Sequence, residues 1–417
     1  MNAAHETGVR PKDGVRDLAR VKAAITPLAA ERPLRIAFVI TGIEVGGAEV
    51  MLWKLLSRID RARFEPSLIV LHGTAAAMLP QFQALGIHCE LLEWRGRRNP
   101  LRGMTQLARA LRARRPDVIQ GWMYHANIAA TLTRAWTRLD APVLWNIRAS
   151  LMERRHEKWR TLLLIRLGGK LSFSPARIIN NSAASALEHE REMGYRAAKR
   201  VVLPNGFDTD RFRPSPTARA AVRASLGLTD STLLIGCIGR YHPMKDHRAF
   251  LRAAALVAQA RGDVSFVLAG KGVEPANAEL ADLIAEHALD DRVHLLGPRS
   301  DIAEITASLD ISVSSSSSGE GFPNVIGEAM SCAVPCVVTD VGDSAAVVGD
   351  AGITVPPRDC QALAQAVLRL IDLGGTGRAA LGLRARQRAI ERFSLDAVVR
   401  QYEDLYTQVH QEQRSGR

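Results

Sequence analysis

The feature that most constrains the fold is a regular alternation of short apolar runs with helical stretches, from Leu34 to about Val355. Such alternation is typical of a parallel sheet wrapped by helices, because parallel strands are joined by crossover helices. The runs are almost continuously apolar, which suits strands that are buried on both faces. Strands are predicted at residues 34–41, 66–73, 117–122, 142–147, 177–182, 200–204, 232–239, 264–270, 292–297, 311–316, 335–340 and 351–355.

These runs form two sets, separated by a loop-rich stretch at 206–231. A chain of 417 residues is also longer than one hydrophobic core usually supports. We therefore predict an α/β protein with two Rossmann-like, doubly wound domains that face each other across a cleft. The predicted parts are a poorly ordered N-terminal extension at 1–32, a first domain at 33–205, a second domain at 206–393 and a helix at 394–413 that packs back on the first domain.

Composition indicates neither a membrane-spanning nor a disulfide-stapled protein. No run reaches the roughly 18 consecutive apolar residues of a membrane span, and residues 1–20 lack the apolar segment of a signal peptide. The five cysteines are odd in number and lie mostly in apolar segments, so we interpret even Cys332 and Cys336 as packing residues. We expect a cytoplasmic protein.

The net charge of +12 belongs to the first predicted domain. Residues 33–205 hold 27 Lys and Arg against 13 Asp and Glu, whereas residues 206–417 hold 22 against 26. A basic surface attracts anionic partners, and both nucleic acid and an anionic membrane meet that description. A solvated arginine-rich face is an equally good interpretation. Aromatic residues make up only 5% of the chain, which argues against nucleic acid.

Paired glycines follow the first predicted strand. Gly46 and Gly47 precede a predicted helix, whose free backbone amides favour an anion. This signal is weak by itself, since such turns often contain glycine. The sequence has neither G-x-G-x-x-G at this turn nor a Walker-type Gly-Lys-Ser/Thr, so a dinucleotide or P-loop site is not indicated.

The corresponding loop of the second predicted domain carries two basic residues. Arg240 and Lys245 lie five positions apart in GRYHPMKDH, directly after a predicted strand. A guanidinium fork and an ammonium point charge can together hold two phosphates. Two solvated basic residues are the alternative.

A further candidate segment is GEGFPNVIGEAM at 319–330. Its tight loop carries Glu320, and the following helix, opened by Pro323 or Asn324, carries Glu328. A carboxylate accepts two hydrogen bonds at once, so each glutamate can hold a pair of sugar hydroxyls. In isolation, such a pair is more often plain surface.

Together these segments resemble the retaining glycosyltransferases of family 4 with the GT-B fold, also described as glycosyl transferases group 1. The most specific part is the pair Glu320 and Glu328, separated by seven residues within a longer matching run. The resemblance covers nearly all of residues 34–409. The segments that carry it are GGAE (46–49), VLPNGFDTDRFRP (202–214), GRYHPMKD (239–246), VLAGKG (267–272), VHLLGPRSDI (293–302), SSSSSGEGFPNVIGEAMSCAVPCVVTDVGDSA (314–345) and FSLDAVVRQYEDLY (393–406).

The resemblance implies a role for each candidate residue in binding the donor. Arg240 and Lys245 would neutralise the leaving diphosphate, as a metal ion does in other transferases. Glu320 would contact the transferred sugar, and Glu328 the ribose hydroxyls. The other implied donor contacts are Gly46 and Gly47 near the phosphate, Gly297 and Arg299 near the base, and the backbone of Phe322, Pro323, Asn324 and Val325 near sugar and phosphate.

His125, in WMYHAN at 122–127, matches a family histidine near the reacting carbon, although a lone histidine at a strand end is otherwise more often structural. The implied catalytic residues are therefore His125, Arg240, Lys245 and Glu320. Family members retain the anomeric configuration without a residue that reliably acts as covalent nucleophile. The resemblance implies same-face attack, in which the leaving phosphate helps to take the acceptor proton and positioning supplies most of the rate.

Two aspartate features need separate interpretation. Asp246 stands where many relatives have glycine, which leaves the shape of this loop open. Asp208 and Asp210 mimic the Asp-x-Asp metal motif of another transferase fold, but their setting matches the family's entry into the second domain. We interpret them as turn residues and expect no bound metal or other cofactor.

The implied substrates are a hexose donor linked to UDP or GDP and a saccharide or polyprenyl- or lipid-linked acceptor, in bacterial cell-surface polysaccharide synthesis. Segment 153–171 combines basic and large apolar residues and is a candidate for binding the anionic inner face of the plasma membrane. A helix that covers the core is an equal alternative. The alternative functions are a nucleotide-sugar epimerase on the same fold and a basic nucleic-acid-binding protein, and we expect no nucleic-acid partner.

Overall fold

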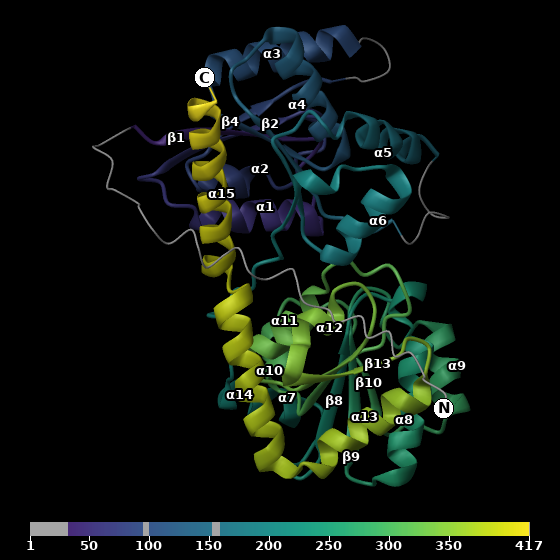
Figure 1. Ribbon diagram of the computed structural model, residues 1–417. Coiled ribbons are helices and arrows are strands. Elements are labelled where there is room, and N and C mark those ends of the chain that lie inside the picture. Colours follow the sequence, from purple (N-terminus) through teal and green to yellow (C-terminus); the bar gives the residue numbers. More distant parts are fainter. Residues whose placement is uncertain (1–31, 95–99, 152–158, 417) are drawn as a thin grey trace, which may run out of the picture. The chain divides into compact units, whose positions relative to one another are not determined.

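The computed structural model describes residues 32–94, 100–151 and 159–416 (Figure 1). The predicted N-terminal extension at 1–32 lies, except for Arg32, outside the described residues. Residues 34–417 form one compact unit of the chain. Within this unit the strands form two separate sheets, and all strand pairs within them are parallel.

The first sheet has seven strands in the order β3-β2-β1-β4-β5-β6-β7. The strands are β1 (Leu34–Ile40), β2 (Phe64–Val70), β3 (His88–Leu91), β4 (Val118–Trp122), β5 (Val143–Ile147), β6 (Arg177–Asn180) and β7 (Arg200–Val202). The helices between them are α1 (Gly47–Arg58), α2 (Leu79–Ala84), α3 (Pro100–Arg114), α4 (Tyr124–Thr137), α5 (Trp159–Leu171) and α6 (Ala183–Met193). The sequence did not predict β3, because this edge strand has only four residues and no apolar run.

The second sheet has six strands in the order β10-β9-β8-β11-β12-β13. The strands are β8 (Leu233–Ile238), β9 (Val264–Ala269), β10 (Val293–Leu295), β11 (Ile311–Ser314), β12 (Cys336–Thr339) and β13 (Gly352–Val355). Its helices are α7 (Pro216–Ser225), α8 (His247–Ala260), α9 (Ala278–Glu286), α10 (Ile302–Ala307), α11 (Asn324–Ser331), α12 (Ser344–Val348), α13 (Cys360–Asp372) and α14 (Gly374–Phe393). Every strand that the sequence predicted here is present.

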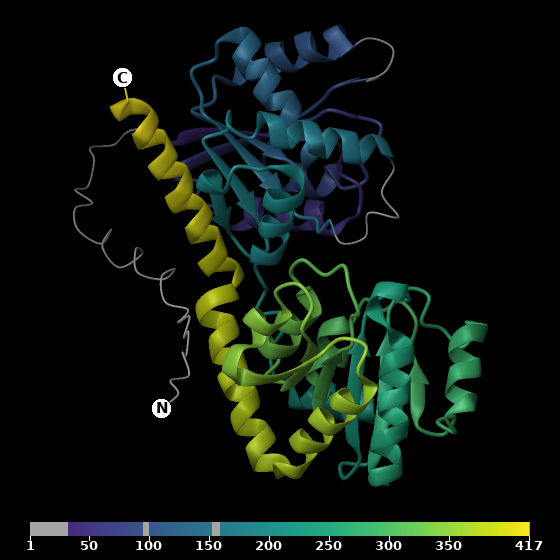
Figure 2. The same ribbon diagram turned by 45° about the vertical axis from the view of Figure 1, so that its right-hand side comes forward.

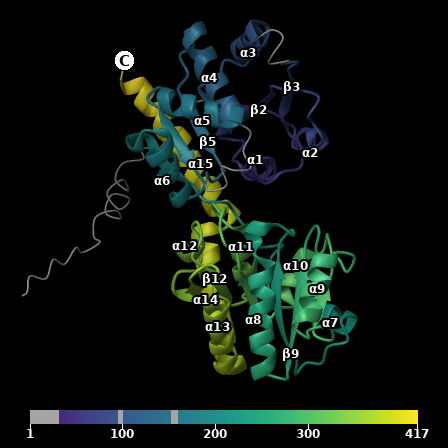
Figure 3. The same cartoon turned by 90° about the vertical axis from the view of Figure 1, so that its right-hand side faces the viewer.

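Both sheets are covered on both faces, which is why their strands are continuously apolar. In β8, Cys237 joins the core under α8, α9 and α13, whereas Leu234, three positions earlier and so on the other face, joins the core under α10, α11, α12 and α14. Figure 3 shows α8 and α13 side by side. The strand order reverses between β1 and β4 and between β8 and β11, where such sheets bind ligands. The predicted α/β class with two Rossmann-like domains is confirmed.

The C-terminal helix α15 (Leu395–Ser415) packs beside α1 on the first sheet (Figures 1 and 2). The Ser394 side chain caps it by accepting a hydrogen bond from the amide of Ala397 at 3.2 Å. The side chains that α15 buries recur at helical spacing. They are Leu395, Val398, Val399, Tyr402, Leu405, Tyr406 and Val409.

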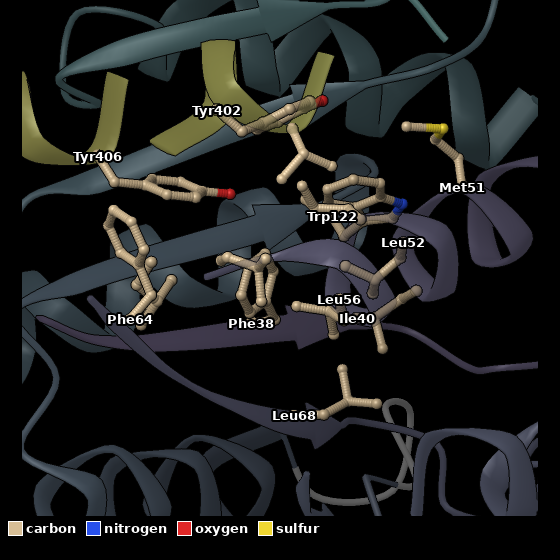
Figure 4. Packing of buried hydrophobic residues seen from close by; sticks show 14 of the residues in the cluster. Phe38, Ile40, Met51, Leu52, Leu56, Phe64, Leu68, Trp122, Tyr402 and Tyr406 are labelled. Carbon is tan, nitrogen blue, oxygen red and sulfur yellow. The ribbon is translucent and has the colours of Figure 1, made fainter. Parts of the chain in front are cut away.

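Two tyrosines of α15 lie over the aromatic side chains of the first sheet (Figure 4). Tyr402 stacks on Trp122 with ring centroids 6.4 Å apart. Tyr406 meets Phe38 and Phe64 edge to face, at 6.2 and 6.1 Å. Both tyrosines are fully buried. The helix therefore forms part of the first hydrophobic core rather than a surface appendage.

The two hydroxyls differ in their hydrogen bonds. The Tyr402 hydroxyl accepts hydrogen bonds from Asn146 Nδ2 at 2.9 Å and from an Arg148 guanidinium nitrogen at 3.0 Å. Among the described residues, the buried Tyr406 hydroxyl has no hydrogen-bond partner. Burial raises the pKa of Tyr406 well above its usual range. A tyrosine hydroxyl thus stabilises the fold through hydrogen bonds at Tyr402 but not at Tyr406.

We expect Tyr402→Phe to lower the free energy of unfolding by about 1–3 kcal/mol, because the buried Asn146 amide and the half-buried Arg148 guanidinium lose this acceptor. Tyr406→Phe has the same change in composition and should be neutral or stabilising, because it removes a hydroxyl that makes no hydrogen bond. Urea denaturation of the two variants and the parent protein measures the difference. Equal losses would contradict the hydrogen bonding described for these tyrosines.

Candidate functional site

The candidate site lies at the carboxyl ends of β8 and β11, where the order of the second sheet reverses. The loop after β8 and the loop after β11 are joined there. The amide of Ser317 donates a hydrogen bond to the carbonyl of Met244 at 2.8 Å. The Ser315 hydroxyl donates to the carbonyl of Lys245, also at 2.8 Å. These bonds fix the two loops relative to each other.

An ion pair connects the functional side chains of these loops. Lys245 Nζ contacts Glu320 Oε1, and the same oxygen accepts a hydrogen bond from the Ser316 hydroxyl at 2.7 Å. The Glu320 side chain is 10% exposed and that of Lys245 is 18% exposed. The structure therefore brings together two of the residues that the sequence assigned to one site. An anion that binds here competes with Glu320 for the ammonium group.

Arg240 begins the loop that ends in Lys245. It is exposed, and its guanidinium approaches Met244 Sδ at 3.9 Å. No salt bridge to Arg240 is found in the part of the chain that the structure describes. The loop thus presents one cation that is already paired and one that remains available to a ligand.

Glu328 lies half-buried on α11. Burial raises the pKa of its carboxyl group, and the nearby positive charges of Lys54, Arg211 and Lys245 oppose that rise. Within the described ranges its carboxylate has neither an ion pair nor a hydrogen bond. A partly buried carboxylate without partners weakens a fold, and such groups are enriched in functional sites.

The start of α11 points a helix terminus at the same loop. Pro323 occupies the N-cap, and no side chain of the described residues caps the helix. The first backbone amides of a helix have no partner within it and favour an anion. Phe322 is buried and stacks on Phe207 at 5.9 Å, Asn324 is exposed, and Val325 is half-buried. Phe322 therefore anchors the loop from which the amides project.

The remaining predicted donor contacts of the second domain lie on a neighbouring loop. Gly297 has a left-handed backbone, with φ of 66°, and hydrogen-bonds to Val273 and Gly270 at 2.8 Å each. Arg299 is paired with Asp301 through two hydrogen bonds of 2.6 and 2.7 Å. Gly297 is therefore bonded to the loop of Gly270, which itself lies against Gly239 and Arg240. Arg299 instead has an acidic partner of its own.

The sequence did not determine the shape of the loop at Asp246, and the structure shows it. Its φ of 49° lies in the left-handed region, which favours glycine but which aspartate tolerates better than most residues. The Asp246 carboxylate also accepts a hydrogen bond from the amide of Ala249 at 3.1 Å, and so caps α8. The aspartate can therefore replace glycine because it supplies the cap.

The Asp208 carboxylate accepts hydrogen bonds from the amides of Asp210 and Arg211 at 3.2 and 3.0 Å. This geometry confirms its interpretation as a turn residue. In the described part of the chain, no group of three or more His, Cys, Asp or Glu residues lies close enough to hold a metal ion. Cys332 and Cys336 are buried free thiols, as packing residues are expected to be.

The predicted glycines of the first sheet lie at the start of α1. Gly46 is the N-cap and Gly47 is the first helical residue. The Glu49 side chain folds back over Gly46, so that a Cβ atom there would lie 2.4 Å from Glu49 Oε2. Only glycine fits this approach without movement of the carboxylate. Within the described residues, these glycines make no contact with Lys245 or Glu320.

His125 is the second residue of α4, at the carboxyl end of β4. Met123, two residues earlier, has a backbone φ of 72°. Residues other than glycine rarely adopt this conformation, and such strained residues cluster near functional sites. The imidazole reaches solvent, while partial burial and the neighbouring His72 lower its pKa. His125 is therefore neutral at neutral pH and able to accept a hydrogen bond or a proton.

Sequence reasoning missed the residues that brace the site. Asp343, in the buried turn after β12, accepts hydrogen bonds from the amides of Ala183 and Ala184 at 2.8 and 3.0 Å. These amides begin α6 of the first sheet. The amide of Asp343 donates to the carbonyl of Gly321, next to Glu320, at 3.0 Å. No local pattern could reveal this, because the capped helix is about 160 positions away.

A second missed network passes through Asn205. Its side chain accepts a hydrogen bond from Arg148 and donates one to Asn324 Oδ1 at 2.6 Å. Arg148 also bonds to Tyr402 and lies over the Trp122 ring, 5.4 Å from the centroid. Hydrogen bonds thus connect the start of α11 to side chains of the first sheet and to α15. The only sequence signal was the position of Asn205 in a Pro-Asn-Gly turn.

Comparisons with known proteins agree with this geometry. The model of Glycosyltransferase Family 4 matches residues 45–211, and that of Glycosyl transferases group 1 matches residues 232–372. EpsF of Bacillus subtilis is 25% identical over 308 residues, 73% of this chain and 79% of that protein. The lipopolysaccharide core biosynthesis mannosyltransferase LpsB of Rhizobium meliloti is 27% identical over 271 residues, 62% of this chain and 72% of that protein.

Among solved structures, Anabaena Alr3699/HepE in complex with UDP has a TM-score of 0.78 and 23% identity, covering 90% of this chain and 100% of that chain. The two Rossmann-like domains and the matching family models define a glycosyltransferase with the GT-B fold. The chain belongs to glycosyltransferase family 4, the family that its sequence resembles.

We expect Asp343→Ala to lower stability by about 0.5–2 kcal/mol, through loss of a helix cap, and to slow glycosyl transfer about 10- to 100-fold. Asp359→Ala is the matched control, because Asp359 caps α13 through the amide of Ala362 at 2.8 Å and braces no site loop. Thermal unfolding and turnover of a nucleotide sugar measure the two effects. Equal activity of the two variants would show that Asp343 acts as a cap alone.

Proposed function

We propose that the protein is a retaining hexosyltransferase that moves a sugar from a UDP- or GDP-linked donor to a saccharide or lipid-linked saccharide, in bacterial cell-surface polysaccharide synthesis. The observation that carries this proposal is the ion pair of Lys245 and Glu320 at the reversal point of the second sheet, with Arg240 and Glu328 on the adjoining loop and helix. Such a set combines cations for a diphosphate with carboxylates for sugar hydroxyls.

In this proposal the two basic residues hold the donor diphosphate. Arg240 offers a fork and Lys245 a point charge, and the amides at the start of α11 add a positive helix end. These groups stabilise the negative charge that develops on the phosphate as the bond to the sugar breaks. The transfer is then independent of a metal ion.

The carboxylates orient the sugar and the ribose. Glu328, whose oxygens accept no hydrogen bond from the described residues, is assigned to the paired ribose hydroxyls. Glu320 is assigned to the transferred hexose. Because Lys245 and Ser316 already hold one Glu320 oxygen, this carboxylate suits positioning better than nucleophilic attack on the anomeric carbon.

The proposed mechanism is same-face substitution. The bond between the anomeric carbon and the phosphate oxygen breaks with its electron pair moving to the diphosphate. The acceptor oxygen then bonds to the same face of that carbon, and its proton passes to the departing phosphate oxygen. His125 is assigned to the region of the reacting carbon, where a neutral imidazole can accept a hydrogen bond.

A membrane-bound acceptor is supported by the exposed face of α5. Three large apolar side chains, Trp159, Leu163 and Leu167, are exposed there. Exposed basic residues alternate with them on the same helix, namely Arg160, Arg166 and Lys170. This combination suits an anionic leaflet. None of the helices in the described ranges has the length and apolarity needed to cross a bilayer.

The first test is a thermal-shift screen of nucleotide diphosphates and their sugars in the presence of a chelator. A ligand at about 100 times its dissociation constant adds about 2.7 kcal/mol of stability. UDP and UDP-glucose are the first probes, because Anabaena HepE was solved with each of them, and GDP-mannose is the next, because LpsB is named as a mannosyltransferase. Absence of any stabilisation by nucleotides would overturn the proposed function, and turnover of the donor without an acceptor would point to an epimerase.

Glu328→Gln separates the roles of Glu328 in stability and in binding. A carboxyl group with a raised pKa weakens the fold increasingly as the pH rises through that pKa, because the ionised form is disfavoured. We therefore expect the ligand-free variant to melt higher at pH 7 and to bind the nucleotide about 10- to 100-fold more weakly, through loss of charged hydrogen bonds. The exposed Glu286→Gln is the control. Unchanged nucleotide affinity would contradict the assignment to ribose.

Liposome flotation tests the proposed membrane surface. We expect binding to vesicles that contain anionic lipid at low salt, weaker binding at high salt, and little binding to neutral vesicles. The triple variant Trp159→Ala, Leu163→Ala and Leu167→Ala should lose most of this binding while retaining nucleotide affinity. Equal flotation with neutral and anionic vesicles would remove the membrane from the proposal.

A further inference from the structure

The helices α3, α4 and α5 cover one face of the first sheet; Figure 1 labels all three. A cavity of about 570 Å³ lies beside His125 on this face. Its wall is apolar, and the helices supply most of it. The apolar side chains that line it include Trp94, Met104, Ile128, Ala129, Leu132 and Leu164. This volume is within the usual range for small-molecule sites, so the cavity has room for a sizeable ligand group.

The polar side chains of the lining come from strand ends. Thr41 follows β1, His72 follows β2 and His125 follows β4, and all three line the cavity. The cavity therefore has a polar end at the carboxyl edge of the sheet and an apolar body beneath the helices. A sugar ring in that body would lose its hydrogen bonds to water without finding partners, which is costly. A hydrocarbon chain would lose none.

The apolar body is continuous with exposed apolar surface. Leu132 lines the cavity and is 41% exposed. One turn further along α4, Trp136 is 56% exposed. On α5, Leu164 lines the cavity while the adjacent Leu163 is 60% exposed. A chain in the cavity can therefore leave along the side of the molecule that also carries the exposed face of α5.

We propose that this cavity binds the hydrocarbon chain of the acceptor, with the acceptor's polar head at Thr41, His72 and His125. That the bound hydrocarbon belongs to an acceptor rests on the proposed transferase function. That the cavity is apolar does not depend on this function. The proposal deepens that function by naming the acceptor class as an amphiphile with a lipid tail. The occupant is a single hydrocarbon chain that the lining side chains enclose, and not the surface of a bilayer.

The test uses n-alkyl glucosides with chains of one, six, eight and ten carbons, each below its micelle concentration, and the full-length protein in isothermal titration calorimetry. Burial of each added CH₂ is expected to tighten binding about fourfold, from about 0.8 kcal/mol per group, until the cavity is filled. Methyl glucoside should bind weakly or not at all. Equal affinity for all chain lengths would overturn the proposal.

Ala129→Trp should abolish the dependence on chain length, because the indole fills the cavity that Ala129 lines. Ala135→Trp is the matched control, since Ala135 is exposed on the same helix and does not line the cavity. If Ala129→Trp does not fold, Leu132→Asp replaces it, because this half-exposed position tolerates a charge that opposes an apolar chain. Unchanged alkyl binding in the variant that folds would overturn the proposal.

Nucleotide binding in the same variants separates this proposal from the proposed function. If nucleotide diphosphates stabilise the protein but alkyl chains show no dependence on length, the hydrocarbon site is overturned and the transferase assignment stands. If alkyl binding depends on the length of the alkyl chain but no nucleotide binds, the assignment of the bound hydrocarbon to an acceptor is overturned. The proposal is supported if the protein binds nucleotides and also binds alkyl glucosides more tightly with increasing chain length. Ala129→Trp should then lose the dependence on chain length and keep nucleotide binding.

Discussion

The candidate site depends on one ion pair, that between Lys245 and Glu320. Two loops from different strands must each keep a charged side chain in a mostly buried position, and neither charge is tolerable there alone. The serine run solves this locally: Ser316 holds the carboxylate, while Ser315 and Ser317 tie its loop to the loop of Lys245. What looks like low complexity in the sequence is a row of specific hydrogen bonds.

The same loop is also connected to the first sheet. Asp343 joins the carbonyl beside Glu320 to the start of α6, and Asn205 joins Asn324 to Arg148. Because hydrogen bonds are short-ranged and directional, a shift of either partner would alter the geometry of the loop that carries Glu320. The loop of Glu320 and the start of α11 are therefore linked to the first sheet through polar contacts, and the core packing of α15 supports that link.

Much of the fold could be predicted because apolar runs and short sequence motifs are both local signals. Near-continuous apolar runs between helical stretches indicated buried parallel strands, and all but the edge strand β3 were found. The sequence could place Lys245 and Glu320 in one cluster because both lie in short segments at strand ends. Asp343, Asn205 and Arg148 were not, since their partners are distant in the sequence. The cavity beside His125 was missed for the same reason, because its lining comes from several strand ends and helices.

The sequence by itself determined the α/β class, the two doubly wound domains and the family, because strand burial and motif spacing are properties of contiguous residues. Tertiary structure alone decided which of these charges are paired: Lys245 is held by Glu320 and Arg299 by Asp301, whereas Arg240 and Glu328 have no ion pair among the described residues. It also decided that Asp246 serves where glycine is usual. These outcomes depend on distances between residues far apart in the chain, which a linear pattern does not encode.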